Sequence, residues 1–139
     1  MSSELRPGAG VAVVVPTRNR PDTCPATVLS LVEARTAGCE LVVVDQSDDD
    51  ATMQALAAQD LLKQIRYVRS AGRGASAARN EGIKLTAAEL LLFTDDDCVV
   101  APDWVNAWRN AMDADPLVEI AFGAVRNPGD DGAGEGGED

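Results

Sequence analysis

The sequence predicts an α/β fold with a Rossmann-like, mostly parallel sheet and flanking helices. Four short runs rich in apolar and β-branched residues, at residues 11–15, 41–44, 65–69 and 90–94, alternate with stretches of helical pattern. Continuous apolar runs are typical of strands buried on both faces. Their alternation with helices favours parallel strands joined by right-handed crossovers.

Each expected helix carries its own sequence signals. Asp22 or Thr23 can cap the first helix, Pro25 suits its first turn, and Gly38 is placed to end it. The second helix follows three aspartates, whose charge suits a helix N-terminus. The third and fourth helices are expected at residues 76–85 and 102–112, and a fifth strand at residues 117–125.

Length and composition divide the chain into one domain and two short ends. The 139 residues predict an N-terminal extension at residues 1–10, a domain at residues 11–126 and a disordered tail at residues 127–139. The tail is rich in glycine, with five acidic residues and no basic one. We expect a cytoplasmic chain, because the three widely spaced cysteines suit reduced thiols and no apolar run approaches the ~20 residues of a membrane span.

The net charge of -11 excludes some partners. Nucleic acids and anionic membranes both require clustered basic residues, so neither is expected. An acidic protein that binds a phosphorylated ligand instead needs a local positive element, such as an arginine, a helix N-terminus or a metal ion.

The conspicuous polar residues fall at the ends of the expected strands. They are Thr17 to Arg20, Asp45, Arg73, and Asp95 to Asp97. Ligands of open α/β sheets bind beyond the carboxyl ends of the strands. The sequence therefore predicts a binding site at this edge of the sheet.

The aspartate triplet directly follows a strongly apolar strand. In an extended segment Asp95 and Asp97 project to one side and Asp96 to the other. Adjacent carboxylates repel one another and favour a bound cation. Because the chain has no histidine, oxygen ligands and hence Mg²⁺ or Mn²⁺ are expected. The alternative is a solvated acidic loop with Asp97 or Asp103 capping the next helix.

A glycine-rich loop precedes the third helix. Residues 72–77 read G-x-G-x-x-A, which is close to a dinucleotide fingerprint, and this keeps an NAD- or flavin-binding domain as an alternative. The fingerprint normally opens the first strand–helix unit, whereas here it lies in the third. In either case the loop can turn backbone N–H groups and Arg73 toward phosphate, while Arg79 can pair with a carboxylate such as Asp95.

Taken together, the pattern resembles the inverting glycosyltransferases of family 2, which have a GT-A fold. Four segments carry the resemblance in the correct order: V-A-V-V-V-P-T-R-N-R at residues 11–20, L-V-V-V-D-Q-S at 41–47, G-A-S-A-A-R-N-E-G-I at 74–83 and L-L-F-T-D-D-D at 91–97. The resemblance implies that residues 11–126 bind a nucleotide sugar, most often a UDP-sugar, with a divalent metal at a D-x-D motif. A sugar nucleotidyltransferase is disfavoured, because its glycine loop should follow the first strand.

The resemblance also assigns the nucleotide end of the site. It implies that Thr17 and Asn19 lie near the nucleotide, that Asp45 reads the base, and that Arg73 lies near the base or the diphosphate. Gln46 stands where the family often has a second acid, and its amide can still hydrogen-bond a base.

At the metal end, the resemblance implies that Asp95 and Asp96 lie near the ribose and diphosphate, and that Asp97 binds the metal together with Asp95. Family members continue well past this motif, and the later part supplies the acceptor site and the catalytic base. We therefore expect a truncated chain with no catalytic residue assigned and an unknown acceptor. The alternative is a non-catalytic remnant that needs a partner chain or self-association.

Overall fold

The computed structural model describes residues 10–115, so the expected fifth strand at residues 117–125 and the acidic tail lie outside the described residues. The strands are β1 (Val11–Thr17), β2 (Glu40–Asp45), β3 (Arg66–Arg69) and β4 (Leu90–Phe93). They form one sheet in the order β3-β2-β1-β4, and every pair is parallel. The predicted parallel α/β fold is confirmed.

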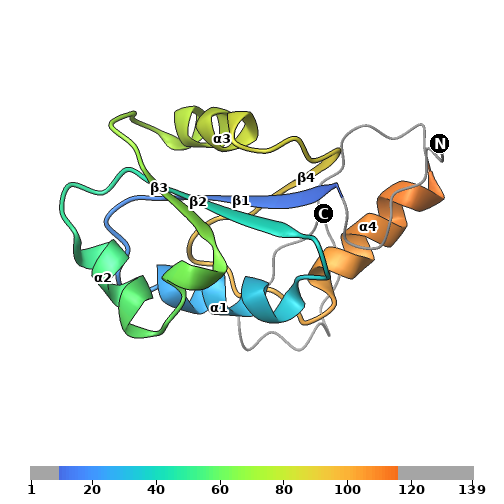
Figure 1. Cartoon of the computed structure of the whole chain (residues 1–139), viewed down its shortest axis with the longest axis horizontal. Helices are drawn as coiled ribbons and strands as arrows, with labels where there is room; N and C mark the ends of the chain where they lie inside the picture. Colours follow the sequence, from blue (N-terminus) through green and yellow to red (C-terminus); the bar gives the residue numbers. More distant parts are fainter. Residues whose placement is uncertain (1–9, 116–139) are drawn as a thin grey trace, which may run out of the picture.

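Helices cover both faces of this sheet (Figure 1). They are α1 (Cys24–Ala34), α2 (Ala51–Ala58), α3 (Ala75–Lys84) and α4 (Trp104–Ala114), with a short 3₁₀ turn η1 (Leu62–Gln64). Of the helices within residues 10–115, α3 lies on one face and the others lie on the opposite face. Within residues 10–115 no helix is both long and apolar enough to cross a bilayer.

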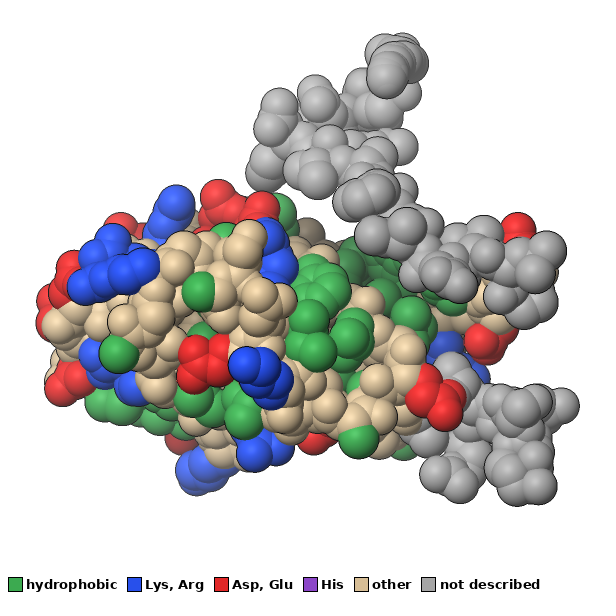
Figure 2. Space-filling view, turned by 90° about the horizontal axis from the view of Figure 1, so that it is seen from above, with side chains coloured by type: hydrophobic (Ala, Val, Ile, Leu, Met, Phe, Trp, Pro, Cys, Tyr) green, Lys and Arg blue, Asp and Glu red, His purple; other side chains and the backbone are tan. Residues whose placement is uncertain are grey.

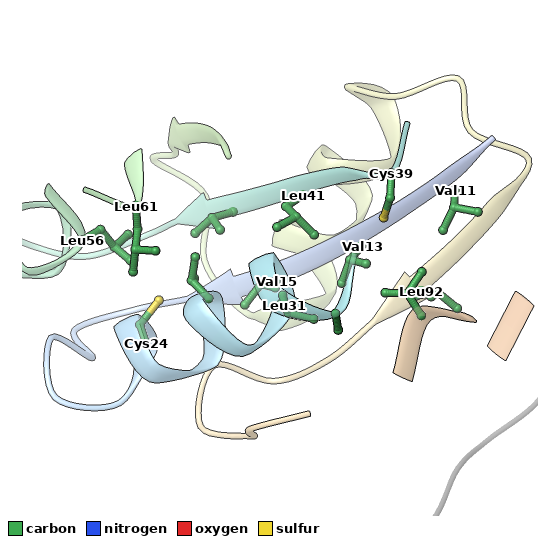
Figure 3. Close-up of a cluster of buried hydrophobic side chains, with 14 residues drawn as sticks. Val11, Val13, Val15, Cys24, Leu31, Cys39, Leu41, Leu56, Leu61 and Leu92 are labelled. Carbon is green, nitrogen blue, oxygen red and sulfur yellow. The ribbon is translucent and has the colours of Figure 1, made fainter. Parts of the chain in front are cut away.

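β1 is buried along its whole length and lies between two apolar cores. Val11, Val13 and Val15 point into the larger core beneath α1, α2 and α4, which Figure 3 shows in close-up. Val14 points to the opposite face, where it packs with Val42, Val44 and Ala78 under α3. A strand buried on both faces fixes its register firmly, because a slip of one residue would exchange the two cores.

α3 covers β1 and β2 but leaves part of this face open. Ile83 and Phe93 are 37% and 39% exposed, and hydrophobic side chains gather at the surface beside α3 (Figure 2). β4 is also an edge strand among the described residues. An exposed edge with apolar side chains is a site for association. Self-association or a partner chain stays a prediction.

Two sequence signals at α1 were misread. Thr23 occupies the N-cap position as expected, but its side chain makes no capping bond; the residue at N2 is Pro25, which has no N–H to donate. α1 ends at Ala34, before Gly38. Gly38 instead has φ +83° in the turn that leads into β2.

Candidate functional site

The site lies where β1 and β4 separate. β1 pairs with β2 as far as Thr17 but with β4 only as far as Val14. The next residues of β1 include Pro16, which has no N–H to offer a neighbouring strand. The two strands therefore separate at their carboxyl ends, which is the place in an open α/β sheet where ligands bind.

A pocket of about 300 Å³ fills this gap. It is lined by Pro16, Thr17, Arg18, Arg20, Gln46, Gly74, Ala75, Asp95, Asp96 and Asp97. Five of the eight predicted site residues, Thr17, Gln46, Asp95, Asp96 and Asp97, are thus brought together. A second hollow of about 250 Å³ lies by Glu40 and Arg66, at the amino ends of β2 and β3, and contains none of the predicted residues.

The aspartate triplet divides between the inside and the outside of the protein. Asp96 is 9% exposed, and its Oδ2 accepts a hydrogen bond from the hydroxyl of Thr17 at 2.7 Å. Asp95 and Asp97 are exposed. The predicted alternation is confirmed, although the triplet lies in the turn after β4. The Thr17–Asp96 bond joins the two sides of the gap at the base of the pocket.

Asp95 and Asp97 are each opposed by an arginine. Arg79 of α3 lies 3.6 Å from Asp95, as expected from the sequence, and Arg20 lies 4.0 Å from Asp97. All four side chains are between 37% and 66% exposed. Long, solvated pairs of this kind contribute little, about 0–1 kcal/mol each. A divalent cation could therefore displace the arginines at small cost.

The donor set in this turn suits a hard cation. One ligand atom from each of Asp95, Asp97 and Cys98 lies within 4.8 Å of the others. Mg²⁺ and Mn²⁺ prefer carboxylate oxygen to sulfur. The residues present therefore fit the predicted metal, with the two aspartates as its protein ligands and the pocket beside them free for further oxygen ligands.

Asp45 lies behind the pocket lining rather than in it. It is fully buried, and its Oδ2 accepts a hydrogen bond from the hydroxyl of Tyr67 at 2.5 Å, while its Oδ1 accepts one from the N–H of Ser47 at 2.9 Å. Burial and the bond to Asp45 raise the pKa of Tyr67 well above its ordinary value. In the structure described, Asp45 stabilises the end of β2.

Gln46 is a buried residue of the pocket lining whose amide nitrogen lacks a partner among the described residues. It is 4% exposed, and this nitrogen is Nε2. A buried amide without a partner costs about 1–3 kcal/mol, which a ligand with an acceptor atom could recover. Gly72 lies beside it, where a Cβ would approach Nε2 to 3.5 Å.

Asn19 and Arg73 lie outside the lining, and both contact Asp48. Asn19 has φ +56°; its backbone N–H donates to Ser47 Oγ at 2.8 Å and its amide donates to Asp48 at 3.0 Å. Arg73 is 67% exposed and donates to Asp48 at 3.3 Å. Gly74, with φ +93° at the start of α3, reaches the pocket instead.

Sequence reasoning missed two residues that organise the site. Asp48 joins two loops, and Tyr67 bonds to Asp45. Tyr67 could have been found, because β3 pairs with β2 and an aromatic residue on a neighbouring strand can reach a buried acid. Nothing in the local pattern distinguishes Asp48 from the two aspartates that follow it.

A model of one protein family matches most of this sequence. The family model described as "Glycosyl transferase family 2" matches residues 12–136. Among curated proteins, validoxylamine A glucosyltransferase of Streptomyces hygroscopicus subsp. jinggangensis is 32% identical over 127 residues, and hyaluronan synthase of Pasteurella multocida is 31% identical over 102 residues. These matches cover 85% and 71% of this chain, but only 30% and 10% of the relatives.

Solved structures agree on the fold. A mannosyltransferase from Pyrobaculum calidifontis, in complex with GDP-Man and Mn²⁺, superposes with a TM-score of 0.69 at 27% identity, over 81% of this chain and 34% of its own. Staphylococcus aureus TarS in complex with UDP gives 0.63 at 23% identity, over 75% of this chain and 32% of its own. The sheet and helices therefore form the GT-A fold.

Proposed function

Because this chain belongs to glycosyltransferase family 2, we propose that it binds the nucleoside-diphosphate part of a sugar donor in the pocket between β1 and β4. Residues 11–126 would form the donor-binding portion of a metal-assisted glycosyltransferase. One observation carries the proposal: the separation of β1 and β4 brings Thr17, Gln46 and the aspartate triplet around a single pocket.

The three carboxylates of the triplet would have different roles. Asp97 and Asp95 would hold Mg²⁺ or Mn²⁺, which neutralises negative charge on the departing nucleoside diphosphate. Asp96, fixed by Thr17, would lie between the ribose and the diphosphate. Arg20 and Arg79 would be released from the metal-binding carboxylates and could then face phosphate oxygens.

The nucleotide would extend from the triplet toward Gln46. Gln46 has a buried amide nitrogen with no described partner, which suits an acceptor atom on the base or ribose. Asp45 would act on the base only if Tyr67 gave up its short bond. UDP is the first nucleotide to test, since TarS was solved in complex with UDP, and GDP is the second, since the mannosyltransferase was solved in complex with GDP-Man.

Transfer itself needs more than this site. Direct displacement at the anomeric carbon requires a base that deprotonates the acceptor hydroxyl, and we assign none among residues 10–115. The chain also covers less than half of the relatives that it matches. A non-catalytic nucleotide-sugar-binding chain that works with a partner is therefore the second candidate, and the acceptor is unknown.

Calorimetric titration with UDP, with and without Mn²⁺, tests the proposal directly. We expect binding that strengthens with Mn²⁺ and falls on the order of tenfold in Asp97→Asn, which removes one ligand charge. Asp113→Asn is the matched control, because Asp113 is exposed on α4 and lies outside the pocket lining. A folded protein that binds neither UDP nor GDP would refute the donor site, and binding of NAD without metal would favour a dinucleotide-binding domain.

A further inference from the structure

Three loops at the carboxyl edge of the sheet meet at one exposed carboxylate, that of Asp48. Arg18 and Asn19 come from the loop after β1, Asp48 from the loop after β2, and Arg73 from the loop after β3. Of these, Arg18 lines the pocket, whereas Asp48 lies outside the lining. Asp48 can therefore act on a ligand only through the groups that it holds.

The bonds to Asp48 are numerous for an exposed side chain. Arg18 Nη2 donates to its Oδ1 at 3.0 Å and to its Oδ2 at 3.2 Å. Asn19 donates to Oδ2 at 3.0 Å and accepts the backbone N–H of Asp48 at 2.9 Å, and Arg73 donates to Oδ1 at 3.3 Å. The bonds from Asn19, Arg73 and Arg18 hold the pKa of Asp48 below its usual range, so it is charged at neutral pH.

Two further bonds fix the loop after β1, one to the loop after β2 and one to the first turn of α2. The N–H of Asn19 donates to Ser47 Oγ at 2.8 Å, and the N–H of Arg20 donates to Thr52 Oγ1 at 3.1 Å. The backbone that follows Arg18 is therefore held at both Asn19 and Arg20. What remains to be fixed is the direction of the Arg18 side chain, and Asp48 is its only ion-pair partner among the described residues.

We propose that Asp48 is a positioning residue for the nucleotide, which holds the Arg18 guanidinium at the pocket wall and ties the Arg73 loop to it. This inference rests on the proposed function. Asp48 uses only Nη2 of Arg18, so the other N–H groups of the guanidinium, which has five in all, remain for a ligand. A planar guanidinium held by one nitrogen is pre-oriented both to stack on a base and to donate to an oxygen.

Loss of the Asp48 carboxylate should change the affinity for UDP in the direction opposite to that expected from charge alone. Removing a carboxylate near an anionic ligand lowers repulsion and should tighten binding. If Asp48 positions Arg18, its removal should weaken binding instead, because Arg18 then samples orientations away from the pocket. The sign of the change therefore separates positioning from simple electrostatics.

The chain offers a matched control in the adjacent residue. Asp49 is exposed and outside the pocket lining, and its side chain accepts only the N–H of Ala51 at 3.0 Å among the described residues. Asp49→Asn removes the same charge one residue away, and its amide oxygen can still accept that bond. Both variants affect exposed side chains, so thermal unfolding should report folded proteins, and binding is compared below the transition of each.

The experiment is a double-mutant cycle on the dissociation constant for UDP with saturating Mn²⁺, using Asp48→Asn, Arg18→Ala and the double variant. We expect Asp48→Asn to weaken binding roughly threefold to tenfold, as for coupled neighbours. Asp49→Asn should leave binding unchanged or slightly tighter. In the Arg18→Ala background, Asp48→Asn should change binding by less than about twofold, because the residue through which Asp48 acts is gone.

Three outcomes would overturn the inference. If the wild type binds UDP and Asp48→Asn binds it equally well or more tightly, Asp48 affects the ligand only through its charge and does not position Arg18. An equal loss with and without Arg18 would show that Asp48 does not act through it. If the wild type binds neither UDP nor GDP, the proposed donor site fails and this inference fails with it, which the wild-type titration alone reveals.

Discussion

Gly82 of α3 packs directly against Val14 of the sheet, and Gly82→Ala tests how tightly that layer is packed. A Cβ at this position would lie 2.4 Å from Cγ1 of Val14 and 3.3 Å from its Cγ2. Val14 is fully buried in the central strand β1 and packs under α3. Because its χ1 rotation is restricted, Val14 cannot turn its methyl groups away without disturbing the core.

Two opposing terms set the magnitude. Alanine is favoured over glycine inside a helix by about 1 kcal/mol. Overpacking a well-filled core costs about 1–3 kcal/mol, and a contact of 2.4 Å places this site at the upper end. We therefore expect a net loss of about 1–2 kcal/mol in the free energy of unfolding. Each 1 kcal/mol lowers Tm by roughly 4–8 °C in a domain of about 60–100 residues and by roughly 2–4 °C in one of about 150–250, so a fall of several degrees is expected here.

Urea unfolding followed by circular dichroism measures this loss. Asn80→Ala is the control, because Asn80 is an exposed residue of α3 and should gain stability from helix propensity alone. Val14→Ala should relieve the contact, so the double variant should lose less than the sum of the two single losses. Gly82→Ala as stable as the wild type, or losses that simply add, would refute a close contact between α3 and β1.

Two further predictions concern buried carboxylates. Thr17→Val removes the hydroxyl that donates to Asp96 at 2.7 Å and should lower the free energy of unfolding by about 1–3 kcal/mol; an unchanged urea midpoint would contradict this. Tyr67 is the single tyrosine, and its raised pKa predicts that its absorbance change on ionisation begins well above the ordinary value of about 10. Because the folded state holds the phenolic proton more tightly, this contribution to stability is complete below pH ~10 and is lost at higher pH. Tyr67→Phe should remove that loss, and equal pH dependence of unfolding in both proteins would count against the Tyr67–Asp45 bond.

The local sequence was enough to predict which side chains of the aspartate triplet point inward and which point outward. The alternation of side chains along an extended segment predicted that Asp96 would separate from Asp95 and Asp97, and the structure has it buried while the other two are exposed. The expected pairing of Arg79 with Asp95 is also present, at 3.6 Å. It joins α3 to the turn after β4, so it depends on the fold as well as on the local sequence.

Contacts between distant loops could not be predicted in this way. Asn19 was expected at the nucleotide, yet its amide is bonded to Asp48, a residue 29 positions away. That pairing depends on how far two loops extend beyond β1 and β2, and no periodicity encodes it. The end of α1 was misplaced for a related reason, since a glycine with positive φ serves a turn before a strand as well as a helix end.

The bond between Thr17 and Asp96 also bears on when the site comes into being. It joins residues 79 positions apart, and the β1–β4 pairing beneath it, from Val11 with Leu90 onward, is equally remote in sequence. Contacts of this separation form slowly, because the entropy of closing a long loop is lost before the contacts can stabilise the structure. During synthesis on the ribosome, β1, α1 and β2 emerge long before β4, so the pocket cannot assemble until β4 and the aspartate triplet have been made.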